Sequence, residues 1–197
     1  MSPTDRIREH LLSSAGQLSD TAERLTGPII RASECMSETL LQGGRVLSCG
    51  SGVNSVLAQY LSILLLNRFQ RERPGLPAMN LNSDAALMNA IAKDHSFDEV
   101  CSRQIRTLGQ EGDALIVICG LDSDPGLKET FTAARDRALR LIVLDNEVGA
   151  SSDVLLESDD IGIHAPAVSE AGCREIHLSI IHCLCELIDV QIFGDTL

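Results

Sequence analysis

Aromatic side chains are scarce in this chain of 197 residues, which has no tryptophan, one tyrosine and four phenylalanines. Aliphatic side chains must therefore fill the core, and a hydrophobic content of 44% is ordinary for a globular protein. A chain of this length can bury a substantial core in one domain. The sequence has no internal repeat and no linker that would mark a second domain, so we expect a single domain over residues 1–197.

Basic residues are also in short supply, since 16 Lys and Arg against 28 Asp and Glu give a net charge of −12. Nucleic acids and anionic membrane surfaces are bound by clustered Lys and Arg, so direct binding to either is disfavoured. A basic protein partner is compatible with this charge, although charge that only keeps the protein soluble is the simpler explanation.

No secretion signal is recognisable, because the first residues are charged where a signal peptide is apolar. The longest apolar stretch, near residues 56–66, falls well short of the ~20 residues that a membrane span needs. We therefore expect a cytoplasmic protein.

The seven cysteines are odd in number and include no CxxC motif. Several lie in apolar runs, which favours buried, reduced thiols over a disulfide framework. His177 and His182 are five residues apart, about 140° around a helix, and so do not form the i,i+4 pair typical of zinc sites. Cys173 with His177, and His182 with Glu186, have that spacing but lack further ligands. We expect no metal and no other cofactor.

Short apolar segments alternate with helical patterns, which predicts an α/β fold: a three-layer αβα sandwich whose parallel sheet is covered on both faces. The expected strands are RVLSCG, MNL, GDALIVICG and LRLIVLD, with one or two more in DVLLES and DIGIHAP. Helices are expected over residues 3–25, about 28–41, the stretch after residue 52, about 85–92 with Asp84 as cap, 97–108, the stretch after Asp124-Pro125, and 169 to about 192.

Ligands of such sheets bind at the carboxyl ends of strands, near the switch in strand order. The loops over residues 50–55, 82–84 and 119–125 are therefore candidates. Gly50-Ser51-Gly52 is typical of a phosphate-binding turn, but a tight βα turn needs glycine with or without a phosphate. The helix that follows is apolar on every side at Ile63–Leu66, which predicts burial in the sheet layer or at a subunit interface.

Four segments resemble the phosphoheptose isomerase family: GGRVLSCGSG, AQYLSILLLNRFQRERPGLPA, IAKDHSFDEVCSRQIRTLGQEGD and EIHLSIIHCLCELIDVQIFG. They are most similar to the branch of DnaA initiator-associating proteins (DiaA), which regulate replication. The resemblance covers nearly the whole chain with collinear spacing. It implies a sugar isomerase (SIS) domain with a five-stranded parallel sheet over residues 43–197. It also implies an N-terminal helical pair, residues 1–42, used in oligomerisation, and a homotetramer with sites between subunits.

The resemblance also implies roles for single positions, and several of these have changed. Tyr60 stands where catalytic members carry a histidine that helps to bind zinc, and Leu64 stands at the position of their catalytic glutamate. The regulatory branch lacks this glutamate as well. Arg174 replaces a glutamine near the metal and substrate. His182 matches the catalytic histidine of the family, and Asp94 matches a retained acidic position. The zinc ligands of the family, in contrast, are largely absent here.

Both phosphate loops of the family have changed too. A phosphate-binding serine falls on Asn54, beside Ser55, and the second loop reads Cys-Gly-Leu-Asp-Ser-Asp over residues 119–124. Asp122 and Asp124 would repel a phosphate dianion, and Asp124 is better suited to cap the following helix. A cation bound by Asp122, Ser123 and Asp124 is the alternative to this cap and turn.

We therefore expect a non-catalytic, oligomeric regulatory or binding protein, associated with itself as a homotetramer and with a replication initiator protein. The alternative is an isomerase of sedoheptulose 7-phosphate, or another phosphosugar isomerase or binding protein, with acid–base work by His182 and Asp94. A packed or interfacial role for His182 is favoured over a catalytic one. A sensor of a neutral or cationic sugar derivative is a third case. The candidate ligand-binding residues are Ser51, Asn54, Ser55, Asp84, Ser123, Asp124 and Arg174.

Overall fold

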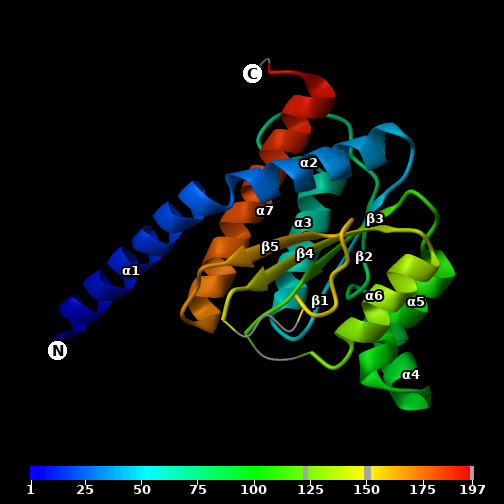
Figure 1. The fold of residues 1–197 in the computed structure, drawn as a ribbon, viewed down its shortest axis with the longest axis horizontal. Helices are drawn as coiled ribbons and strands as arrows, with labels where there is room; N and C mark the ends of the chain where they lie inside the picture. Colours follow the sequence, from blue (N-terminus) through cyan, green and yellow to red (C-terminus); the bar gives the residue numbers. More distant parts are fainter. Residues whose placement is uncertain (122–123, 149–151, 196–197) are drawn as a thin grey trace.

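The computed structural model describes residues 1–121, 124–148 and 152–195. The sheet has five strands. It lies between two groups of helices (Figure 1), which confirms the predicted α/β fold with three layers. The strand order is β2-β1-β3-β4-β5, and each neighbouring pair is parallel. The strands are β1 (Val46–Gly50), β2 (Ala78–Asn80), β3 (Ala114–Ile118), β4 (Arg140–Asn146) and β5 (Ile161–Ala165).

Alternate residues of the strands point to opposite faces of the sheet, and each face has its own core. The helices are α1 (Pro3–Arg24), α2 (Thr26–Leu41), α3 (Asn54–Leu66), α4 (Ala85–Asp94), α5 (Val100–Leu108), α6 (Leu127–Asp136) and α7 (Glu170–Phe193), with a 3₁₀ turn, η1, over Phe97–Glu99. Ile116 and Ile118 pack with α2, α3 and α7, whereas Leu115 and Val117 pack with α5 and α6.

Three predicted boundaries differ from the structure. The break between the first two helices falls at Leu25, so that Pro28 lies within the first turn of α2, where its missing N–H costs no helical hydrogen bond. The segment DVLLES makes no strand, because the backbone N–H groups of Leu155 and Leu156 both donate to the Ser152 carbonyl and close a turn. The helix expected from Phe97 starts with the 3₁₀ turn η1 before α5 begins.

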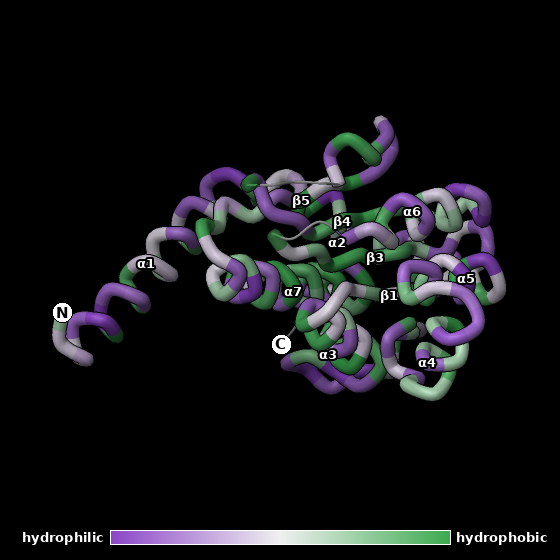
Figure 2. The backbone as a smooth tube through the Cα atoms, turned by 90° about the horizontal axis from the view of Figure 1, so that it is seen from below, coloured by the Kyte–Doolittle hydropathy of each residue, from purple (hydrophilic) through white to green (hydrophobic). Residues whose placement is uncertain are grey.

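The N-terminal helix α1 extends away from the body of the molecule (Figures 1 and 2). Four of its large apolar side chains are exposed: Ile7, Leu11, Leu12 and Leu18. Its contacts with the body include a hydrogen bond between His10 Nε2 and Glu175 Oε1 on α7, at 3.2 Å. Helix α1 therefore carries apolar side chains that no other part of the described chain covers.

Within the described residues, α7 is the one helix long and apolar enough to cross a membrane by length and composition. It packs against α2 and α3 on one face of the sheet (Figure 1). Ile176, Ile180 and Leu184 on α7 are buried in the core. The apolar character of α7 is thus that of a core helix.

Arg73 joins the end of α3 to α7. Its Nε atom donates to Asp189 Oδ1 at 2.6 Å, and both side chains are buried, with 1% and 5% of their surfaces exposed. The other guanidinium nitrogens donate to the Leu64 and Leu65 carbonyls in the last turn of α3, at 2.9 Å each. One buried guanidinium therefore satisfies a helix end and a carboxylate together.

We predict that Asp189→Asn lowers the free energy of unfolding by about 3–5 kcal/mol, because it leaves the Arg73 charge buried without its counter-ion. The matched control is Glu72→Gln, which removes a carboxylate from the exposed i,i+4 pair with Arg68 and should cost less than about 0.5 kcal/mol. Urea unfolding of both variants measures the difference. Equal, small losses would contradict a structural role for the buried pair.

Candidate functional site

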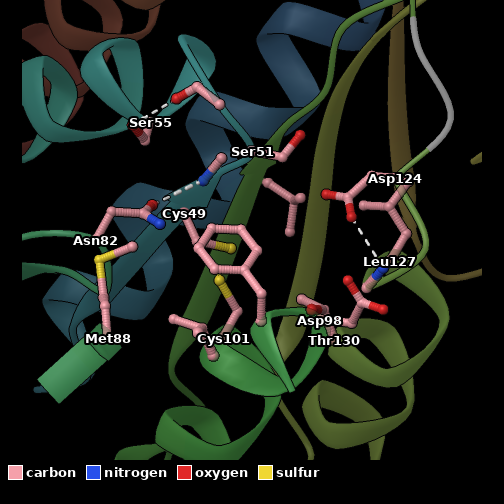
Figure 3. A pocket seen from close by; sticks show the side chains of 16 residues that line it. Cys49, Ser51, Ser55, Asn82, Met88, Asp98, Cys101, Asp124, Leu127 and Thr130 are labelled. Atoms are coloured by element: carbon pink, nitrogen blue, oxygen red, sulfur yellow. Dashed lines mark hydrogen bonds between the residues drawn. The ribbon is translucent and has the colours of Figure 1, made fainter. Parts of the chain in front are cut away.

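The strand order reverses between β1 and β3, and the candidate site lies there. Gly50 at the end of β1 pairs with Ile118 at the end of β3, so the loops that follow both strands leave the sheet side by side. A cleft of about 120 Å³ opens at this edge, between these loops, the loop after β2 and the start of α5 (Figure 3). This is the place where open α/β sheets bind ligands.

Hydrogen bonds from side chains of the protein itself hold the loop after β1. Asn82, which follows β2, accepts a hydrogen bond from the Gly50 N–H at 3.0 Å, and the Ser55 hydroxyl donates to the Gly52 carbonyl at 2.7 Å (Figure 3). A side chain at Gly50 would come within 2.7 Å of the Asn54 carbonyl oxygen, so the close approach of α3 requires glycine there. The glycine turn thus has a structural cause that needs no phosphate.

The described residues that line the cleft carry negative charge only. Asp98 and Asp124 supply two carboxylates, and the lining includes no Lys, Arg or His. Asp124 Oδ1 accepts from the Gly126 N–H at 2.9 Å, whereas the N-cap of α6 is Gly126, without a side-chain cap. The predicted cap is therefore wrong in detail, because the Asp124 side chain closes the turn that precedes the helix. The cleft as a whole is unfavourable for an anion.

Glu170, in the first turn of α7, reaches the loop after β3. One of its carboxylate oxygens accepts from the Leu121 N–H, and the other accepts from Arg174 Nη2 at 2.7 Å. A Cβ atom added at Gly120 would lie 2.9 Å from Asn54 Nδ2 and 3.0 Å from Glu170 Oε1, so both groups flank this glycine. An internal carboxylate thus engages the backbone donor and the cation that an anionic ligand would use.

The predicted ligand-binding residues divide among separate places. Ser51, Ser55 and Asp124 line the cleft. Asn54 is buried beside Gly120, and its Oδ1 atom has no hydrogen-bond partner within the described part of the chain. Arg174 pairs with Glu170, and Asp84 caps α4 by accepting from the Leu87 N–H at 2.9 Å, as predicted for the cap. Asp122 and Ser123 lie outside the described residues.

His182 lies away from this cleft, on α7. Its Nε2 atom is 3.1 Å from the Tyr60 hydroxyl, and its ring is 5.5 Å from the Phe69 ring, centroid to centroid. Leu64, one turn further along α3 from Tyr60, is 8% exposed and belongs to the core. Asp94, the last residue of α4, is exposed, and α4 and α7 lie apart in Figures 1 and 2. Within a single subunit, His182 and Asp94 therefore lie apart.

Zinc, which the resemblance implies for catalytic members, does not fit the side chains present. In the described ranges, no three His, Cys, Asp or Glu side chains are grouped as metal ligands. The Tyr60 and His182 pair would supply two ligands, and a structural zinc site has four protein ligands while a catalytic site has three. His177 is fully buried with Nε2 3.1 Å from the Asp145 carbonyl, and burial lowers its pKa, so it is a neutral core histidine.

Sequence reasoning missed Asn82, Asp98, Cys101 and Glu170. Asn82 carried a signal, since it follows a predicted strand within a loop already marked as important. Glu170 carried a weaker one, an acidic residue four positions before Arg174 in a predicted helix. Its contact with Leu121 spans 49 residues and could be seen only in the folded chain.

Comparison with known proteins is consistent with this architecture. The family model described as the SIS domain matches residues 12–146, so this is a SIS-domain protein. The chain is 38% identical over 195 residues to the phosphoheptose isomerase of Methylococcus capsulatus, covering 99% of this chain and 100% of that relative. It is 40% identical over 191 residues to the phosphoheptose isomerase of Chromohalobacter salexigens, covering 97% of each.

Solved structures agree. A phosphoheptose isomerase from Francisella tularensis superposes with a TM-score of 0.91 at 34% identity, covering 96% of this chain and 99% of that one. The corresponding protein from Neisseria gonorrhoeae gives a TM-score of 0.88 at 28% identity, covering 95% and 99%. The chain belongs to the phosphoheptose isomerase family.

We predict that Leu64→Glu lowers the free energy of unfolding by roughly 2–4 kcal/mol, because a carboxylate would replace a buried core side chain. Gln59→Glu adds the same charge at an exposed position of the same helix and should change stability by less than about 0.5 kcal/mol. Thermal and urea unfolding compare the two. A Leu64→Glu variant as stable as Gln59→Glu would mean that this position tolerates the glutamate that the family resemblance implies.

Proposed function

We propose that this chain is an oligomeric binding protein built on the phosphoheptose isomerase fold, and that it does not catalyse aldose–ketose exchange. The observation that carries the proposal is Leu64, an apolar core residue at the position where the family resemblance implies a proton-transferring glutamate. A leucine side chain cannot accept or donate a proton, and isomerisation moves a proton between neighbouring carbons.

The surroundings of His182 support the same proposal. Its Nε2 atom faces a phenol, Tyr60, and its ring lies against the Phe69 ring. This packing suits a histidine that joins α3 to α7. The retained Asp94 is exposed on another helix.

The cleft supports the proposal through size and charge. Its volume of about 120 Å³ is below the ~300–1,000 Å³ of ordinary small-molecule pockets. Asp98 and Asp124 oppose a phosphate, and Glu170 already engages the Leu121 N–H and Arg174. A sugar phosphate would have to displace one carboxylate and approach two others.

Phosphoheptose isomerase is the second candidate, and similar proteins favour it, since relatives that are 36–40% identical carry that name. Ser51 and Ser55 in the cleft, with His182 and Asp94, are the groups available to such an activity. A second subunit would have to bring Asp94 toward His182.

An assay with sedoheptulose 7-phosphate separates the two candidates. We expect no turnover above the protein-free blank, because the described site offers no base opposite His182. His182→Ala tests the remaining candidate acid–base group, and His10→Ala, on the exposed surface of α1, is its control. Turnover that is lost in His182→Ala and kept in His10→Ala would overturn the binding-protein proposal.

Self-association through α1 is part of the proposal. Ile7, Leu11 and Leu18 form one stripe on this protruding helix and are 63%, 63% and 36% exposed. The stripe continues into an apolar groove of about 450 Å³ between α1, α2 and α7. A second copy is the occupant that fits, since it would bring an identical apolar stripe; the family resemblance implies a homotetramer.

The net negative charge suits a basic protein partner, and a replication initiator is the candidate. We place this association in the cytoplasm. We expect light scattering to give about four times the chain mass of 21.2 kDa, and a purified initiator protein to be retained by the immobilised chain. Leu11→Lys should yield smaller species, whereas Ser13→Lys, with the same charge change on the opposite side of α1, should not. A monomer that fails to retain the initiator would contradict both parts.

A further inference from the structure

Two cysteines line the cleft at the carboxyl ends of β1 and β3. All seven cysteines are free, and their burial differs: Cys49 in β1 is 1% exposed, Cys101 in α5 is partly exposed, and Cys183 is exposed. Cys49 and Cys101 both line the cleft, and their sulfur atoms point toward one another in Figure 3. Strand β1 and helix α5 thus present two thiols to one small cavity.

The neighbouring Cys101 side chain, followed by burial, raises the pKa of Cys49 well above its ordinary value. Cys49 is therefore a protonated, poorly reactive thiol at neutral pH. Cys101 is the member of the pair that a solute in the cleft can reach. The arrangement resembles an accessible thiol backed by a resolving thiol.

We propose that Cys49 and Cys101 form a redox-active dithiol in the cleft, which a low-molecular-weight disulfide converts into an intramolecular disulfide. The Cys101 thiolate attacks one sulfur of the reagent, a mixed disulfide forms on Cys101, and one thiolate leaves and takes up a proton. Cys49 then loses its proton and attacks the Cys101 sulfur, and the second thiolate leaves. Two protein thiols are oxidised and one reagent disulfide is reduced to two thiols.

The product would tie the start of α5 to the end of β1. Both anchors border the loop at Gly50 and the cleft residue Asp98. Formation of the bond therefore modifies the floor of the cleft itself. This inference does not depend on whether the chain turns over a sugar, because it concerns two thiols that neither candidate function uses.

Oxidised glutathione is the probe. The reduced full-length chain is incubated with it at pH 7, 8 and 9, quenched with an alkylating reagent, and mapped by peptide mass spectrometry. We expect a peptide pair joined through Cys49 and Cys101, formed faster as the pH rises, because the thiolate is the attacking species. Exposed Cys183 should carry a mixed glutathione disulfide instead.

Two variants sharpen the test. Cys101→Ser should abolish the joined pair and leave Cys49 alkylated only after unfolding, whereas Cys183→Ser should leave the pair unchanged. The wild-type map needs neither variant and reports the bond directly. A stable glutathione adduct on Cys101, a bond from Cys49 to Cys119, or an unmodified Cys101 would each overturn the proposal.

Discussion

The parallel pairing of β1 with β3 is the constraint on which the site depends. Because Gly50 lies opposite Ile118, the two loops that follow cannot separate, and any group placed between them meets backbone donors from both. Two of those donors are satisfied by side chains of the protein itself. Asn82 accepts from the Gly50 N–H, and Glu170 accepts from the Leu121 N–H. Backbone N–H groups that could bind an anion at this edge are therefore engaged by internal side chains.

Helix α7 connects this frame to the stability of the molecule. Its first turn supplies Glu170 to the loop, its middle places His182 against Tyr60, and its last third holds Asp189 against Arg73. Arg73 in turn binds the carbonyl of Leu64. The residue that replaces the expected catalytic glutamate thus sits, through its backbone, in a buried ion-pair network. A substitution of Leu64 that alters its chemistry would therefore also affect the packing around it.

The sequence was sufficient for features that depend on local patterns. Apolar runs predicted the strands, the glycine turn predicted the loop after β1, and Asp84 predicted a helix cap. Each of these features depends on residues that are close together in the chain. Features that join distant segments were not predictable in the same way. The contact of Glu170 with Leu121 and the facing thiols of Cys49 and Cys101 arise only when α7 and α5 dock on the sheet.

Overall similarity and site chemistry carry different information about this family member. A TM-score of 0.91 and identities near 40% depend on packing spread over most of the chain, whereas proton transfer depends on one or two side chains. Leu64 contributes to the hydrophobic core of this chain, so it stabilises the fold, and it offers no carboxylate for proton transfer. A glutamate at this position would need water or an available positive charge, because the neighbouring Arg73 is already paired with Asp189. The residues around a catalytic position, and not the fold alone, decide whether a member of this family can act on a sugar.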